Sequence, residues 1–157
     1  MENKKWNEQI NKVPVYTDPR RRKRMWEDYV LGNTIDGGAI VEFGVADGGS
    51  IGWFTKKFPD TTVIGFDSFE GLPEDWHQES KEVYSTRGKI PKVPTHVTLI
   101  PGWFDQTLPL FLEKHGENVA LINIDCDIYS STKTVLDLLS DRIKKGTIII
   151  FDEYIGN

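Results

Sequence analysis

Short, almost wholly apolar runs recur along the chain. They predict five β-strands at 39–43, 62–66, 96–100, 119–124 and 147–151. Segments with apolar residues at helical spacing lie between several of these runs. They predict helices over about 50–57, over about 108–114, and from about Ser130 to a stop at Lys144-Lys145-Gly146. Apolar strands that alternate with helices are typical of a parallel sheet covered on both faces. The pattern therefore predicts a doubly wound α/β domain with a mostly parallel sheet.

Two long segments fall outside this alternation. Residues 1–17 have no clear period and are expected to form an N-terminal arm or flap, before a helix that starts near Asp18-Pro19. That helix carries a stripe expected to face the core: Met25, Trp26, Tyr29 and Val30. Residues 68–95 are rich in Gly, Pro and charge, which predicts a functional lid, with a partly disordered loop as the alternative.

The first strand leads directly into a glycine-rich turn and then a helix. Gly44, Gly48 and Gly49 allow the backbone to approach a ligand, and the helix after Ser50 begins with unpaired N–H groups. This arrangement is typical of a nucleotide-like cofactor site. Glu42 lies at the tip of the strand, where its carboxylate would repel a pyrophosphate but suit the cationic methionine end of S-adenosylmethionine.

A second acidic residue, Asp67, follows the next strand, about one βαβ unit further on. An acid at this position can accept hydrogen bonds from both ribose hydroxyls of a nucleoside, each worth roughly 1.5–3 kcal/mol to a charged acceptor. Together Glu42 and Asp67 favour S-adenosylmethionine over a dinucleotide. A nicotinamide-dependent oxidoreductase remains the weaker alternative.

Composition and charge narrow the classes of protein. The chain has 157 residues, 38% hydrophobic and 27% charged, which predicts a single globular domain over 1–157 with no membrane-length apolar run. A net charge of −5 argues against a nucleic-acid binder, and the basic run Arg20 to Arg24 is expected to be a solvated helix start. A single cysteine, Cys126, and the lack of a signal peptide pattern predict a cytoplasmic protein without a disulfide framework.

Acidic residues gather after the fourth and fifth strands. Asp125 and Asp127 follow one, and Asp152 and Glu153 follow the other. Because neighbouring parallel strands end at one edge of a sheet, these carboxylates can face a common point, where Mg²⁺ would relieve their repulsion. The trio Asp125, Asp152 and Glu153 is the predicted metal site, while Asp127 is as well explained as a helix N-cap. Such an ion could orient an acceptor hydroxyl and lower its pKa.

Five tracts together resemble the macrocin O-methyltransferase family. They are Val41 to Val45, Gly65 to Pro73, Gly102 to Pro109, Asn123 to Thr132 and Phe151 to Tyr154, and they occur in the family's order. The resemblance implies a Rossmann-like class I methyltransferase fold. It also implies transfer of a methyl group from S-adenosylmethionine to a hydroxyl, often on a sugar, with Mg²⁺ assistance.

The resemblance also implies roles for individual residues. The cofactor would be held by Glu42, Gly44, Ala46, Gly48, Ser50, Asp67 and Ser68. The metal-binding acids would be Asp125, Asp152 and Glu153, with Asp125 also the candidate catalytic base. The family's usual pair after the fifth strand is Asp-Asp, so Glu153 departs from it by one methylene.

Members of this fold normally continue through a helix and two more strands, which the sequence lacks after 147–151. The last strand would then be a sheet edge, covered by another chain in a homo-oligomer unless the product is truncated. The sequence thus predicts an S-adenosylmethionine-dependent, Mg²⁺-assisted O-methyltransferase that acts on a small hydroxylated acceptor, with neither nucleic acid nor membrane as partner. A truncated S-adenosylmethionine-binding module without turnover is the alternative.

Overall fold

The computed structural model describes residues 22–31, 37–116 and 118–152. The chain divides into two compact units, Met1–Thr34 and Ile35–Asn157. In the first unit, helix α2 spans Arg22–Tyr29. Of the predicted apolar stripe, Trp26 and Val30 are buried, whereas Tyr29 is exposed and does not face a core. The predicted arm at 1–17 and the helix start at Asp18 lie outside the described residues.

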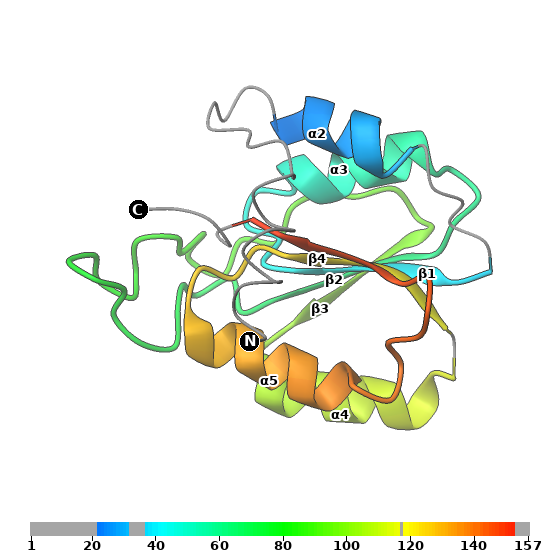
Figure 1. Cartoon of the computed structure of the whole chain (residues 1–157). Coiled ribbons are helices and arrows are strands. Elements are labelled where there is room, and N and C mark those ends of the chain that lie inside the picture. Colours follow the sequence, from blue (N-terminus) through cyan, green and yellow to red (C-terminus); the bar gives the residue numbers. More distant parts are fainter. Residues whose placement is uncertain (1–21, 32–36, 117, 153–157) are drawn as a thin grey trace, which may run out of the picture. The chain divides into compact units, whose positions relative to one another are not determined.

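The second unit contains a five-stranded parallel sheet in the order β3-β2-β1-β4-β5 (Figure 1). Its strands are β1 (Ala39–Phe43), β2 (Val63–Asp67), β3 (Val97–Pro101), β4 (Val119–Ile124) and β5 (Ile148–Phe151). The alternating apolar runs therefore predicted the strands to within a residue at each end. The doubly wound α/β fold is confirmed.

Helices cover both faces of this sheet. Figure 1 shows α4 (Phe104–Lys114) and α5 (Tyr129–Leu139) together on one face and α3 (Gly49–Lys57) on the other. On the α4 and α5 face, the buried core joins alternate strand residues to the two helices. It includes Val41, Phe43, Ile64, Phe66, Leu108, Ile122, Ile124, Val135 and Leu139. The side chains that alternate with these core residues point to the opposite face of the sheet, and Glu42 and Asn123 are among them.

Two helix boundaries differ from the sequence prediction. Helix α4 begins at Phe104, before the predicted start near Leu108, and contains Pro109 in its interior, although proline is usually confined to the first turn. Helix α5 ends at Leu139, and not near Lys144. The chain then turns through Gly146, whose φ of +102° few other residues adopt, before β5 begins.

The connection between β2 and β3 contains no helix. Within it, the amide of Leu72 donates to the carbonyl of Lys81 at 2.7 Å, and the amide of Gly88 donates to the carbonyl of Phe69 at 2.9 Å. The segment, green in Figure 1, projects beyond the sheet where β2 ends. Residues 68–95 thus form a turn-rich segment with hydrogen bonds of its own, and the lid function stays a prediction.

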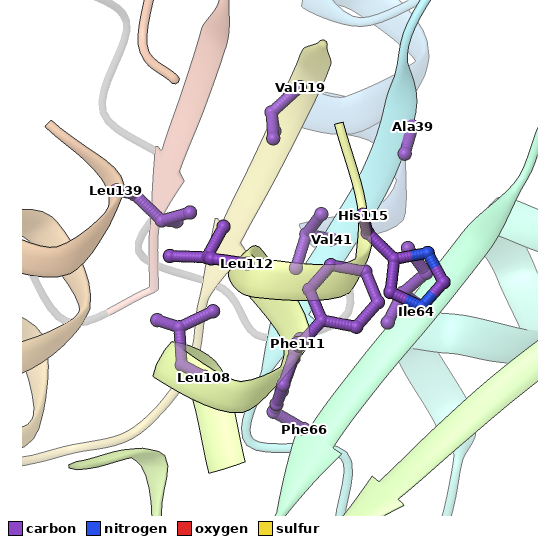
Figure 2. Close-up of a pocket in the computed structure, with 10 residues that line it drawn as sticks. All are labelled: Ala39, Val41, Ile64, Phe66, Leu108, Phe111, Leu112, His115, Val119 and Leu139. Atoms are coloured by element: carbon purple, nitrogen blue, oxygen red, sulfur yellow. The ribbon is translucent and has the colours of Figure 1, made fainter. Parts of the chain in front are cut away.

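An apolar hollow lies between the sheet and α4 (Figure 2). Its lining includes Ala39 and Val119, the first residues of β1 and β4, so it reaches toward the amino ends of the strands. The ring of His115 stacks on Phe111 at its margin, with centroids 4.2 Å apart. Ligands of doubly wound sheets bind at the opposite, carboxyl ends, so this hollow belongs to the core packing. Among the described residues, no helix is long and apolar enough to cross a membrane.

Candidate functional site

The turn after β1 is pressed against the turn after β4. The amide of Asp125 donates to the carbonyl of Phe43 at 2.9 Å, which continues the pairing of β1 with β4 beyond the strands. Gly44 has a φ of +94°, and a Cβ at this position would overlap the backbone oxygen of Asp125. Only glycine satisfies both demands. The turn after β1 and the turn after β4 are therefore in direct backbone contact.

Asp67, at the end of β2, forms hydrogen bonds with the turn after β1. Its Oδ2 accepts hydrogen bonds from the amides of Val45 and Ala46, both at 2.7 Å, and its Oδ1 accepts one from the amide of Phe69 at 2.6 Å. Ala46 and Phe69 have φ values of +47° and +60°, a left-handed conformation that is unfavourable for residues with a Cβ. The carboxylate thus stabilises two strained turns at once.

Glu42 lies inside the molecule at the strand position before Phe43. Its side chain is fully buried, and its Oε1 accepts a hydrogen bond from Nδ2 of Asn123 at 2.8 Å. The two residues are direct neighbours across β1 and β4. The Oδ1 of Asn123 has no hydrogen-bond partner among the residues that the structure describes. A buried carboxylate next to the turn at 44–48 is thus oriented by an amide from the adjacent strand.

Asn123 is a candidate site residue that the sequence reasoning missed. It is the one polar residue in the otherwise apolar strand Val119–Ile124, and it is fully buried. Buried amides nearly always serve a hydrogen-bonding role. That interruption of an apolar run was the available signal.

On the other side of Glu42, its neighbour in β2 is Gly65. A Cβ on Gly65 would lie within 2.6–2.9 Å of side-chain atoms of Val45, Ile51 and Leu99. The missing side chain therefore makes room for the start of the turn at 44–48 and for the first turn of α3.

The acidic turns after β4 and β5 are also adjacent. The amide of Asp152 donates to the carbonyl of Ile124 at 3.0 Å, so Asp152 lies beside the turn that starts with Asp125. Asp127 has a φ of +61°, and α5 takes Ile128 as its N-cap without a side-chain capping bond. The alternative explanation of Asp127 as a helix N-cap is therefore wrong. Asp127 instead adopts a left-handed conformation in the turn before α5.

The predicted metal site is only partly described. Asp125 and Asp152 are half-buried and come from neighbouring strand ends, while Glu153 lies outside the described residues. Within 22–31, 37–116 and 118–152, no group of three His, Cys, Asp or Glu side chains is arranged to hold a metal ion. Two oxygen donors of the predicted trio are thus brought to the same edge of the sheet.

The two predicted serine contacts differ in their local bonding. Ser68 Oγ donates to the carbonyl of Gly71 at 2.8 Å and accepts from the amide of Glu70 at 3.0 Å, so it shapes its own turn. Ser50 lies in the first turn of α3 and is half-buried. Helix α3 begins after Gly48, whose φ is +85°. Its first amides therefore start at the predicted cofactor turn.

Cys126 lies between the two acidic residues but is not part of their chemistry. Its side chain is buried, and its Sγ lies 3.5 Å from Oγ1 of Thr132. Burial raises the pKa of the thiol to about 12. Cys126 is therefore a neutral core residue, as the sequence favoured.

The 68–95 segment approaches both the turn after β1 and the start of α5. On one side, a Cβ on Gly48 would lie 3.2 Å from Cβ of Pro91, which places the segment against the turn at 44–48. On the other, Oγ of Ser130 at the start of α5 donates to Oε1 of Glu74 at 2.6 Å. The segment therefore bridges the turn after β1 and the helix that follows the acidic turn.

Comparison of the sequence with known proteins identifies a family. The sequence model of a family described as a methyltransferase domain matches residues 41–154. The tetracenomycin-C rhamnosyl 4'-O-methyltransferase of Streptomyces olivaceus is 32% identical over 141 residues, which is 74% of this chain and 53% of that protein. The demethyldecarbamoylnovobiocin O-methyltransferase of Streptomyces niveus is 28% identical over 149 residues, 80% of this chain and 55% of that protein. The chain spans about half the length of these curated relatives.

Solved structures agree on the fold. The calicheamicin methyltransferase CalS11 superposes with a TM-score of 0.74 at 24% identity, covering 94% of this chain and 70% of that one. Its apo structure, described as a TDP-rhamnose 3'-O-methyltransferase, gives a TM-score of 0.64 at 26% identity, covering 94% and 69%. The turns described above thus belong to a fold shared with these enzymes.

Proposed function

Because the chain belongs to the methyltransferase domain family, whose model matches residues 41–154, we propose that it transfers a methyl group from S-adenosylmethionine to a hydroxyl of a small, sugar-bearing acceptor. The observation that carries the proposal is the contact between the two turns. Gly44 packs on the backbone of Asp125, so a ligand on the first turn lies next to the acidic turn. The recognition of a methyltransferase family in the sequence motifs is confirmed by the family match.

The cofactor turn has the chemistry for S-adenosylmethionine. The bound cofactor would supply an electrophilic methyl group on a positively charged sulfur. Gly44, Ala46, Gly48 and Ser50 would line it, and Glu42 would provide a buried negative charge beneath it. The amides of Val45 and Ala46 are already bonded to the carboxylate of Asp67. A pyrophosphate would have to compete with that fixed negative charge, which argues against the nicotinamide alternative.

In this proposal the acidic turns supply the ligands of an oxygen-coordinated cation. Asp125 and Asp152 offer carboxylates from adjacent strand ends, and Glu153 follows in sequence as the third predicted ligand. Carboxylates are the ligands that Mg²⁺ prefers, and a bound Mg²⁺ would lower the pKa of an acceptor hydroxyl. In this proposal Asp125 accepts the proton of that hydroxyl, and the acceptor oxygen forms a bond to the methyl carbon as the carbon–sulfur bond breaks. S-adenosylhomocysteine is the leaving group.

The sugar character of the acceptor is supported by the relatives. The names of two of them specify methylation of a rhamnosyl tetracenomycin and of TDP-rhamnose. A deoxysugar hydroxyl is neutral and weakly acidic, so an adjacent base and cation would serve its methylation. The homo-oligomer and the cytoplasmic location stay predictions, and light scattering tests the first of them.

Calorimetric titration of the purified protein with S-adenosylmethionine and S-adenosylhomocysteine, with and without Mg²⁺, tests the proposal. Both ligands should bind, and rhamnose-bearing acceptors should yield a product heavier by one methylene unit. Glu42→Ala should abolish cofactor binding, and Asp152→Asn should weaken only the Mg²⁺-dependent turnover. Asp60→Asn, an exposed carboxylate after α3, is the matched control. Binding without product for any acceptor would instead indicate a cofactor-binding module, and no binding by a folded sample would refute the proposal.

A further inference from the structure

Of the two residues in register with Glu42, only Asn123 has a side chain. Glu42 lies between Gly65 of β2 and Asn123 of β4. The Nδ2 of Asn123 donates to Oε1 of Glu42 at 2.8 Å, and both side chains are fully buried. A glutamate side chain has several rotatable bonds, so a bond at its end restrains the direction in which the carboxylate points.

The chemistry of this partner matters for a cation nearby. The amide of Asn123 is neutral, so its hydrogen bond orients the carboxylate without cancelling the negative charge, whereas a lysine or arginine at this position would neutralise it. The Oδ1 of Asn123 has no hydrogen-bond partner among the described residues, which costs free energy in a buried setting. Stability alone therefore does not explain an amide at position 123.

The oriented charge lies close to the turn at 44–48. Glu42 is two residues before Gly44, where the chain leaves β1. Attraction between a buried carboxylate and a cation is weakly screened by water and salt, so the direction of this carboxylate affects a cation held on the turn. S-adenosylmethionine and S-adenosylhomocysteine both carry such a cation, the ammonium of their amino-acid end.

We propose that Asn123 is a positioning residue, which directs the carboxylate of Glu42 toward the ammonium group of the bound cofactor. The inference rests on the proposed function for its ligand, S-adenosylmethionine. Asn123 acts here through Glu42 and not by touching the ligand. Loss of its amide should therefore weaken ligands that carry the ammonium group and spare ligands that lack it.

The test compares S-adenosylhomocysteine with its analogue without the amino group. Dissociation constants for both are measured on the native protein and on Asn123→Ala. The variant should bind S-adenosylhomocysteine about tenfold or more weakly, and the deamino analogue within about twofold of the native value. Ile122→Val is the control, since Ile122 is a buried neighbour in β4 whose side chain joins the core on the opposite face. It should change neither constant by more than about twofold. Equal weakening of both ligands in Asn123→Ala would overturn the proposal.

A double-mutant cycle shows whether Asn123 acts through Glu42. In Glu42→Gln the preference for S-adenosylhomocysteine over the deamino analogue should fall as it does in Asn123→Ala. The double variant should have the same preference as Glu42→Gln alone, within about twofold. A further loss of about tenfold in the double variant would mean that Asn123 acts independently of Glu42, and would refute the inference.

A further measurement needs no variant. In NMR spectra of the native protein, the side-chain amide resonance of Asn123 should shift when S-adenosylhomocysteine binds and shift less with the deamino analogue, because the ammonium attracts the carboxylate to which this amide is bonded. Equal shifts with the two ligands would refute the role of Asn123 even if Asn123→Ala failed to fold. If the native protein binds neither ligand, the proposed function fails, whereas binding with an unchanged preference in Asn123→Ala refutes this inference alone.

Discussion

Asn123 donates a hydrogen bond to Glu42 across 2.8 Å, although the two residues are 81 positions apart in the chain and both are fully buried. A buried carboxylate costs several kcal/mol unless polar partners surround it. The buried carboxylate of Glu42 lies at the carboxyl end of β1, next to the turn proposed to hold the cofactor. The pair is therefore a buried polar contact in an otherwise apolar sheet centre.

Replacement of Asn123 should expose how strongly Glu42 depends on it. In Asn123→Ala the carboxylate stays buried without this amide, so the free energy of unfolding should fall by about 1.5–3 kcal/mol. Urea unfolding followed by circular dichroism measures the change. Asn118→Ala, at an exposed asparagine just before β4, should change it by less than about 0.5 kcal/mol. Equal losses in the two variants would contradict the assigned role of the Glu42–Asn123 bond.

Two glycine-to-alanine substitutions should have opposite effects. Gly44→Ala places a Cβ on the backbone oxygen of Asp125 at a φ of +94°, and should destabilise the protein by about 2 kcal/mol or more. Gly52→Ala lies within α3 with no atom near the added carbon, and should stabilise it by about 0.5–1 kcal/mol. Urea midpoints of the two variants and the native protein test both signs. A tolerated Gly44→Ala would mean that the two turns are not in contact.

The buried thiol of Cys126 predicts a pH dependence of stability. Burial raises its pKa from the ordinary value of 9.0 to about 12. Between these values the unfolded chain binds fewer protons than the folded one, so stability falls as the pH rises, by at most about 1.4 kcal/mol per pH unit. The free energy of unfolding of the native protein, compared with Cys126→Ala at several values between pH 8 and 10, measures this contribution. Parallel curves would show that the thiol ionises equally in both states.

The bond between Ser130 and Glu74 should restrain the 68–95 segment. Ser130→Ala removes one exposed hydrogen bond, which should speed tryptic cleavage at Lys81, Arg87 and Lys89 by about twofold to tenfold, with little change in global stability. Ser140→Ala removes a comparable serine bond, to the carbonyl of Asp137 at the end of α5, and should leave the cleavage rate unchanged. Identical rates in the two variants would show that Glu74 and Ser130 do not hold the segment.

The strands were predictable because their signal is local. Each strand is a run of apolar residues whose neighbours in sequence suffice to identify it, and Val119–Ile124 was predicted with both ends correct. The end of α5 was not predicted correctly. Residues 140–145 have side chains compatible with a helix, although the chain leaves the helix after Leu139 and turns at Gly146 into β5. Tertiary structure decides such boundaries.

The candidate site was predictable in its composition but not in its bonding. The sequence identified Glu42 and Asp67 as acids at strand ends, and the fold does place them beside the glycine turn. It could not show that Asp67 is bonded to three amides, because those bonds depend on the left-handed turns at Ala46 and Phe69. Nor could it pair Asn123 with Glu42, because that contact follows from the strand order and register.

Gly65 determines how closely the turn at 44–48 and α3 pack on the sheet. Val45 and Ile51 fill the space where its side chain would be. Any larger residue at 65 would push the turn at 44–48 and α3 away from the sheet without changing a residue of the turn itself. Position 65 is therefore a place where the spacing between the sheet and the proposed cofactor turn can be changed, by evolution or by design, while the residues of that turn stay the same.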